Sequence, residues 1–179
     1  MRKALFLLGN LADGDIDWLI SVGTRQKLSA GEVLIQEGQP VTAIYIVLEG
    51  TLAVLVAALN NREIAQLKCG DIVGEMSFVD SRPPSATVKA MMDSLVLSIP
   101  RALLAARLEQ MDFAARFYYA LSVFLAARLR TTIYRFGDGK VETSGKQLEE
   151  EDELDPAILD KVAMAGARFD WLLKRLRGE

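Results

Sequence analysis

Residues 70–90 read GDIVGEMSFVDSRPPSATVKA, a pattern that suggests a site for an anion. A glycine turn leads through Glu75 into one short apolar turn of helix, and a polar loop then returns the chain to a strand. Backbone N–H groups at the start of a short helix favour an anion. A site for a phosphate would also use a fixed arginine, but this loop offers Arg82 followed by Pro83 and Pro84. The stretch therefore indicates an anion pocket in which the two prolines after Arg82 limit how this arginine could reach the anion.

Short runs of β-branched and apolar residues surround this stretch between residues 24 and 99. The runs are TRQKL, EVLIQ, AIYIVL, TLAVLVA, REIAQL, ATVKAM and SLVLSI, and glycines separate several of them. Short strands at fairly even spacing, closed by glycine turns, are typical of a small all-β barrel or roll. The apolar run at 41–59 has the length of a membrane span, but Glu49 and Gly50 at its centre favour two buried strands around a tight turn.

Helical patterns flank the strands on both sides. Residues 3–22 predict a helix in two pieces, broken near Gly9-Asn10, with Asp13 and Asp15 where N-terminal caps would lie. Pro100 suits the first position of a short helix. A much longer helix is predicted to follow over residues 112–136.

The long helix carries two apolar stripes. One repeats at alternating spacings of four and three residues, which is the seam of a coiled coil; its members are Phe113, Phe117, Ala120, Phe124, Ala127, Thr131 and Tyr134. The second lies one step round the helix and consists of Ala114, Tyr118, Leu121 and Leu125. Two stripes suit a helix that contacts its own barrel on one side and a partner on the other, so we predict a homodimer through the first stripe. One wide buried face is the alternative.

Composition narrows the function classes. The 179 residues carry a net charge of -3, which gives no general electrostatic reason to bind nucleic acid or an acidic membrane. The absence of histidine excludes histidine-based acid–base catalysis, and it leaves too few ligands for a structural zinc site. Cys69 alone rules out an internal disulfide and is compatible with a reducing cytoplasm. We therefore expect a cytoplasmic binding module without catalytic residues, metal or cofactor, rather than an enzyme.

The C-terminal part of the chain has a different composition. Residues 137–154 form a polar linker that ends in an acidic run, and residues 155–179 a last helix behind the first unit at 1–136. Cations gather towards the end of this helix, where they favour its dipole, and a solvated charged face explains them better than nucleic-acid contact; they are Arg168, Lys174, Arg175 and Arg177. The sequence leaves the role of the linker and the last helix open.

The order of these elements resembles the cyclic nucleotide-binding domain family, as in catabolite activator proteins. The resemblance covers about residues 11–134, and its best-matching stretches are GEVLIQEGQPVTAIYIVLEG, GDIVGEMSF and SATVKA. It implies a mainly β fold with helices: a double-stranded β-helix, or jelly-roll-like β-roll, with N-terminal helices, a short cassette helix and a long C-terminal dimerisation helix.

The resemblance also implies roles for residues in the opening stretch. Gly74 would let the backbone approach the ligand, and Glu75 would accept a hydrogen bond from the ribose 2′-hydroxyl. Met76 and Ser77 would offer backbone N–H groups to the cyclic phosphate. The alternative for Glu75 is a carboxylate at a helix start that only supports the helix dipole.

The sequence departs from the family at the phosphate arginine. Counting back from ATV, which begins at Ala86, that position holds Pro84, while Ser85 matches the small residue beside it. Arg82 comes two residues too early, and a solvated loop cation is as good an interpretation as a ligand contact. Losing a charge-assisted contact of roughly 1.5–3 kcal/mol predicts weak binding of cyclic AMP. By resemblance, Thr132 on the long helix would contact the base.

Two functions stay open at this point. The first is a dimeric regulatory sensor that binds a cyclic nucleotide or related small anionic ligand and signals through its helices to an unknown protein partner. The alternative is a ligand-free, degenerate β-roll that acts as a dimeric scaffold or protein-interaction module. The family's activators carry a helix-turn-helix domain after the long helix, whereas one helix follows here, so we expect no DNA binding. We expect no membrane binding either.

Overall fold

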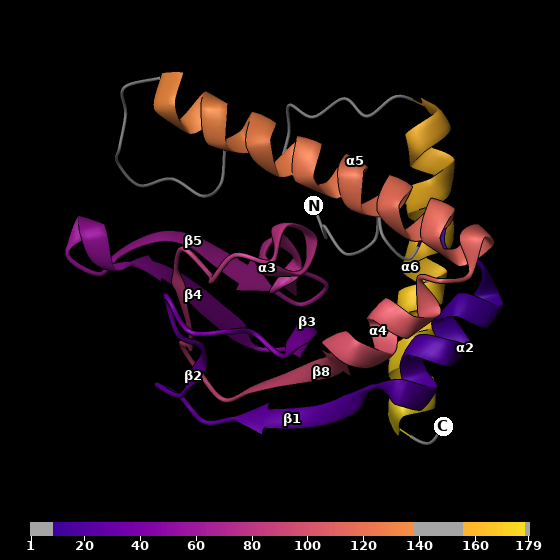
Figure 1. Ribbon diagram of the computed structural model, residues 1–179, viewed down its shortest axis with the longest axis horizontal. Coiled ribbons are helices and arrows are strands. Elements are labelled where there is room, and N and C mark those ends of the chain that lie inside the picture. Colours follow the sequence, from indigo (N-terminus) through magenta and orange to yellow (C-terminus); the bar gives the residue numbers. More distant parts are fainter. Residues whose placement is uncertain (1–8, 138–155, 178–179) are drawn as a thin grey trace.

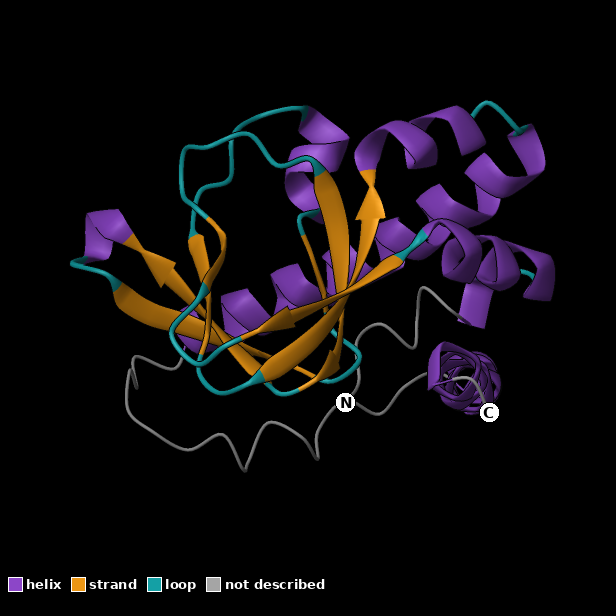
Figure 2. Cartoon of the chain, turned by 90° about the horizontal axis from the view of Figure 1, so that it is seen from below, coloured by secondary structure: helices purple, strands orange, loops and turns teal. Residues whose placement is uncertain are grey.

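The computed structural model describes residues 9–137 and 156–177, and its centre is a roll of two antiparallel four-stranded sheets. The first sheet has the order β1-β8-β3-β6, with β1 at Thr24–Leu28, β8 at Ser94–Pro100, β3 at Ala43–Glu49 and β6 at Ile72–Val73. The second has the order β2-β7-β4-β5, with β2 at Val33–Ile35, β7 at Thr87–Ala90, β4 at Thr51–Val56 and β5 at Arg62–Lys68. Figure 2 shows the strands curving around a common interior. The predicted β-roll with flanking helices is confirmed.

The helices cover the outer side of the first sheet. They are α2 (Asp13–Val22), α4 (Arg101–Arg107), α5 (Met111–Gly137) and α6 (Pro156–Arg177). The short helix α3 (Glu75–Asp80) follows β6, and the 3₁₀ helix η1 (Ala57–Leu59) joins β4 to β5. Figure 1 shows α5 crossing the molecule above α3, with α6 beside α2 at the end opposite η1. Among the described helices, none combines the length and the apolar character that a membrane span requires.

Strand β3 shows why the chain has two apolar cores. Six of its seven residues are buried, so both of its faces are covered. Alternate side chains of a strand point to opposite faces; here Tyr45 and Val47 belong to the cluster inside the roll, whereas Ile44 and Ile46 belong to the cluster beneath the helices. The central strand thus joins the roll to the helical layer.

Three local predictions need correction. Gly9 and Asn10 are helical, and the break between the first helices falls two residues later, at Leu11 and Ala12. Ala12, not an aspartate, is the capping residue of α2, and its backbone N–H donates to the side chain of Asp15 at 2.9 Å. Strand β6 was missing from the predicted runs because its two residues are too few to show a pattern.

The predicted dimer seam on α5 is wrong where burial is described. Phe113, Phe117, Ala120 and Phe124 are at most 3% exposed within a single chain. They pack against the chain's own first sheet and helices, together with Leu121 of the second stripe. The first stripe therefore docks α5 on its own roll, as the alternative of one wide buried face proposed. The side chains of Ala127 and Thr131 lie outside the described part.

The last helix is present as α6, but its charged face is not simply solvated. Arg168 donates from its Nε to Asp13 on α2 at 2.9 Å and is mostly buried. Lys174 and Arg175 are exposed, as predicted. The predicted linker lies outside the described residues, apart from its first residue, Gly137, which ends α5.

Candidate functional site

A cavity of about 250 Å³ opens beside α3, and both sheets, the loop after α3 and α5 line it. Its wall contains eight of the predicted ligand residues, namely Gly74, Glu75, Met76, Ser77, Arg82, Pro84, Ser85 and Ala86. The remaining lining consists of Ile35, Val54, Val73, Asp80, Pro83, Val88 and Arg128. The side chain of Thr132 lies outside the described part. The structure thus brings most of the predicted site residues together around one open space.

Gly74 occupies a position that only glycine fits well. It is the residue before α3, and its φ of +90° lies in the left-handed region. A Cβ at this position would lie 2.9 Å from the carbonyl oxygen of Ala43 on β3. The chain therefore turns from β6 into α3 directly against the neighbouring strand, which places the first turn of α3 at the cavity.

Glu75 forms a buried ion pair that the sequence did not suggest. Its side chain is 1% exposed, and its Oε1 accepts a hydrogen bond of 2.6 Å from Nη1 of Arg128 on α5. Burial raises the pKa of Glu75, and the positive charge of Arg128 offsets only part of that rise. The carboxylate predicted to bind a ribose hydroxyl is therefore already a hydrogen-bond partner of α5.

Helix α4 also contacts α3 and the residue that follows it. Arg101, the first residue of α4, donates to the carbonyl oxygen of Ser77 at 2.6 Å and to the Ser81 hydroxyl at 2.9 Å. Its guanidinium also lies 5.4 Å from the centre of the Phe78 ring, a cation–π distance. Met76 is exposed at the cavity. The position of α3 is thus set by contacts with β3, α4 and α5.

In the loop after α3, Pro84 is fixed by a backbone hydrogen bond, whereas the side chain of Arg82 extends into solvent. The carbonyl oxygen of Pro84 accepts from the backbone N–H of Gly38 at 2.9 Å, which fixes this part of the loop against the turn after β2. The side chain of Arg82 is 83% exposed and lies 4.0 Å from Asp80. The cavity wall therefore has Pro84 at the expected arginine position and Arg82 at its solvent side.

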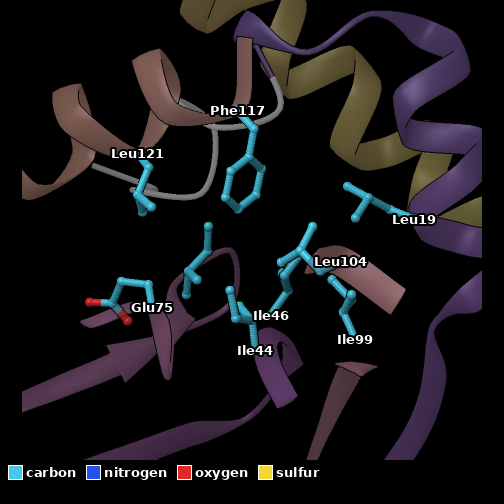
Figure 3. Close-up of a pocket in the computed structure, with 9 residues that line it drawn as sticks. Leu19, Ile44, Ile46, Glu75, Ile99, Leu104, Phe117 and Leu121 are labelled. Atoms are coloured by element: carbon cyan, nitrogen blue, oxygen red, sulfur yellow. The ribbon is translucent and has the colours of Figure 1, made fainter. Parts of the chain in front are cut away.

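A second, much smaller cavity lies on the inner side of Glu75. It measures about 10 Å³, room for no more than a water molecule. Figure 3 shows its lining of Leu19, Ile44, Ile46, Glu75, Ile99, Leu104, Phe117 and Leu121, to which Ile72 also belongs; the carboxylate of Glu75 points away from the apolar group. This space is a packing gap beneath α5 and not part of the ligand site.

Arg128 is the site residue that the sequence reasoning missed. The sequence pattern in this part of the long helix predicts only apolar stripes, and the resemblance adds only Thr132. A signal was nevertheless available, because a carboxylate placed between a strand and a covering helix needs a cation from that helix. The long helix carries Arg128 and Arg130 at the level of the predicted base contact, and burial separates them: Arg128 is partly buried and Arg130 is exposed.

Comparisons with known proteins agree with this geometry. The family model of the cyclic nucleotide-binding domain matches residues 25–111. The chain is 29% identical over 126 residues to the cyclic AMP receptor protein of Thermus thermophilus, covering 69% of this chain and 57% of that protein. It is 34% identical over 109 residues to the lysophospholipase NTE1 of Cryptococcus neoformans, covering 57% of this chain and 6% of that protein. The chain thus spans a part of each relative.

A solved structure shows the same fold. The cyclic nucleotide-binding domain from Methylobacillus flagellatus superposes with a TM-score of 0.69 at 23% identity, covering 79% of this chain and 84% of that chain. The segment that matches the family model contains α3 and all the described cavity residues except Arg128. Roll, cavity and family match agree: residues 25–111 match the cyclic nucleotide-binding domain, and the chain has the fold of such a domain.

Proposed function

We propose that this chain is a regulatory sensor that binds a cyclic nucleotide or a related small anion in the cavity beside α3. The observation that carries the proposal is the open cavity of about 250 Å³ with Gly74, Glu75 and Ser85 in its wall. A roll whose interior had filled with side chains would leave no room for a ligand at this position. The volume is a little below the roughly 300–1,000 Å³ of pockets for drug-sized ligands, so it suits a mononucleotide. Domains of this family are typically regulatory rather than catalytic.

The cavity suggests how such a ligand would bind. The carboxylate of Glu75 would accept a hydrogen bond from a ribose hydroxyl. The first backbone N–H groups of α3, from Met76 and Ser77, would face the phosphate, with the Ser85 hydroxyl opposite them. The apolar side chains of the roll would cover the rest of the ligand. Without a guanidinium at position 84, we expect cyclic AMP to bind weakly.

The signal would leave the cavity through α5. The only described α5 side chain in the cavity wall is Arg128, and it holds Glu75 at 2.6 Å. A ligand hydroxyl at Glu75 would share or replace this hydrogen bond. Ligand binding would therefore change how firmly α5 lies on α3, which gives the sensor an output.

A homodimer remains part of the proposal, but through another face of α5. An outer stripe of exposed, uncharged residues runs along the helix and consists of Met111, Ala115, Tyr118, Ser122, Ala126, Leu129 and Ile133. Its large members are between 47 and 82% exposed. A row of exposed apolar side chains at spacings of three and four residues suits packing against a second helix. We therefore propose that two copies meet along the outer stripe.

Calorimetric titration tests the proposed function. We expect wild-type protein to bind cyclic AMP with a dissociation constant weaker than about 1 μM, and Glu75→Gln to weaken it about tenfold or more through the lost charge-assisted bond. Glu63→Gln on the exposed strand β5 is the matched control and should leave the affinity unchanged. Cyclic GMP, cyclic dinucleotides and adenosine, titrated in parallel, identify the preferred ligand. If none of them binds at millimolar concentration, the ligand-free scaffold is the better interpretation.

A further inference from the structure

The last helix, α6, is packed into the molecule although it lies outside the residues that match the family model. Phe169 and Leu172 are completely buried, and both belong to the apolar cluster between the helices and the first sheet. Trp171, Leu173 and Leu176 pack against the same cluster. Burial of large apolar side chains favours the docked position of a helix. The described part of α6 is therefore an integral part of the helical layer.

Ion pairs join α6 to α2. Arg168 donates to the carboxylate of Asp13 at 2.9 Å and to the carbonyl oxygen of Gly9 at 3.2 Å. Arg175 lies 3.8 Å from Asp17. The two pairs occur in the same order along both helices, so α6 runs parallel to α2. Figure 1 shows the two helices side by side.

The opposite side of α2 is held by α5. Asp13 and Asp17 are one helical turn apart and share a face, whereas Asp15, two positions from each, points to the other side. Asp15 is buried, and Arg116 on α5 donates to both of its carboxylate oxygens, at 2.8 and 3.1 Å. The short motif DGDID thus places α2 between α5 and α6.

The helix that holds α2 is also the helix that reaches the cavity. The Phe117 ring of α5 packs edge-on against the Phe78 ring of α3 with centroids 6.1 Å apart. About three turns further along, Arg128 forms the ion pair with Glu75 at 2.6 Å. Since α5 is one continuous helix of 27 residues, a shift at its cavity end changes the surface that α2 and α6 contact.

We propose that α6 is a clasp on the helical layer, and that the state of the cavity controls how firmly it is closed. With the Glu75–Arg128 pair intact, α5 lies on α3 and the clasp is closed over α2. When this pair opens, α5 shifts and the contacts of Phe169, Leu172 and Arg168 weaken. The role of a ligand as the natural trigger depends on the proposed function, but the coupling itself is a property of the ligand-free chain.

Hydrogen–deuterium exchange on the full chain tests this coupling without a ligand. The double variant Glu75→Gln/Arg128→Gln opens the pair without leaving one buried charge unpaired. We expect the amides of residues 166–176 to exchange about fivefold faster or more, while β3 and β8 keep their protection. Arg82→Gln is the control, because it also removes a positive charge from the cavity wall, but the acid that this charge faces is Asp80, at 4.0 Å, and not Glu75. It should leave the exchange of α6 unchanged.

A reciprocal experiment starts from the clasp, because coupling between two sites acts equally in both directions. Arg168→Gln removes the ion pair with Asp13 and should speed amide exchange in residues 75–80. Lys174 is exposed on the same helix and forms no ion pair with the described residues, so Lys174→Gln should leave the exchange of residues 75–80 unchanged. Since Asp13, the partner of Arg168, is 78% exposed, Arg168→Gln leaves no buried charge unpaired. This experiment therefore decides alone if the Glu75→Gln/Arg128→Gln variant fails to fold.

The outcomes separate this inference from the proposed function. Equal exchange of residues 166–176 in wild type and double variant overturns the clasp, as does unchanged exchange of residues 75–80 in Arg168→Gln. If cyclic AMP does not bind but the ligand-free variants show the coupling, the proposed ligand fails and the clasp stands. If cyclic AMP binds and the coupling is absent, the sensor stands and the clasp fails.

Discussion

The ion pair between Glu75 and Arg128 allows a quantitative prediction. Arg128→Met removes the guanidinium but keeps an unbranched stem, and it leaves the carboxylate of Glu75, which is 1% exposed, beside an apolar side chain. Removing one partner of a buried ion pair costs about 3–5 kcal/mol of stability. The side chain of Arg128 is 27% exposed, so water can reach part of the gap, and we expect the lower end, about 3 kcal/mol.

Differential scanning calorimetry measures this effect. For a protein of this size a loss of 1 kcal/mol lowers Tm by about 2–4 °C, so Arg128→Met should melt about 6–12 °C below wild type. Glu75→Gln alone should cost less, because the guanidinium that it leaves behind is partly solvated. Adding Glu75→Gln to Arg128→Met should recover stability, with a coupling of about 0.5–3 kcal/mol. A Tm of Arg128→Met equal to that of wild type would show that the Glu75–Arg128 pair does not stabilise the fold.

The pH dependence of stability is a second readout of the same pair. Burial raises the pKa of Glu75 above its ordinary value of 4.5, so the folded state binds more protons at this group than the unfolded state. The contribution of Glu75 to stability therefore falls as the pH rises from 4.5 through the folded pKa. Without Arg128 the pKa of Glu75 should rise further, so Arg128→Met should lose more stability than wild type as the pH rises above 4.5. In the Glu75→Gln/Arg128→Met variant, which has no carboxyl group at position 75, this extra loss of stability should vanish.

Three further predictions follow from the same contacts. Pro84→Arg should tighten cyclic AMP by one to two decades, or about 1.5–3 kcal/mol, in calorimetric titrations with Pro84→Ala as the control for loop entropy; equal affinities of the two variants contradict it. In sedimentation velocity, Tyr118→Glu should turn a dimer into a monomer with an unchanged fold, whereas Phe117→Glu should unfold the chain. Burial alone would raise the pKa of Asp15, but the hydrogen bond from Arg116 contributes to a net lowering, so the stabilisation by Asp15 disappears as the pH falls below 3.8. Asp15→Asn should therefore be less stable than wild type near neutral pH. In acid titrations followed by circular dichroism, its stability should also fall less steeply below pH 3.8.

Much of the roll could be predicted from local signals. Strand β3 is a run of β-branched and apolar residues between turns, and its continuous burial explains why the run does not alternate. Gly74 is assigned to the site by resemblance, and its left-handed backbone explains why glycine occurs at this position. The cassette residues from Gly74 to Ser77 are neighbours in sequence, so placing one of them placed the others.

The faces of α5 could not be predicted in the same way. A helix that docks on its own sheet and a helix that pairs with a second copy both repeat apolar residues every three or four positions. The spacing of Phe113, Phe117 and Phe124 therefore fits both structures, and only the position of the sheet and of α6 shows that this stripe is internal. Similarly, 53 residues separate Glu75 from Arg128, and no local pattern connects them.

The charges around the cavity would link the proposed weak binding of cyclic AMP to the proposed signal through α5. Its wall carries two acids and two arginines, with Glu75 paired to Arg128 and Asp80 near Arg82, so it offers no excess of positive charge to a phosphate. A ligand that donates a hydroxyl to Glu75 has to compete with a hydrogen bond of 2.6 Å. Loosening that bond costs free energy, so only a fraction of the molecules is ready to bind at any time. The apparent affinity is lower than the intrinsic affinity by this fraction. In the proposed sensor the same free energy would move α5, because a ligand shifts an equilibrium only by its difference in affinity for the two states. A pocket with a fixed arginine at position 84 would hold its ligand more tightly without making the output larger.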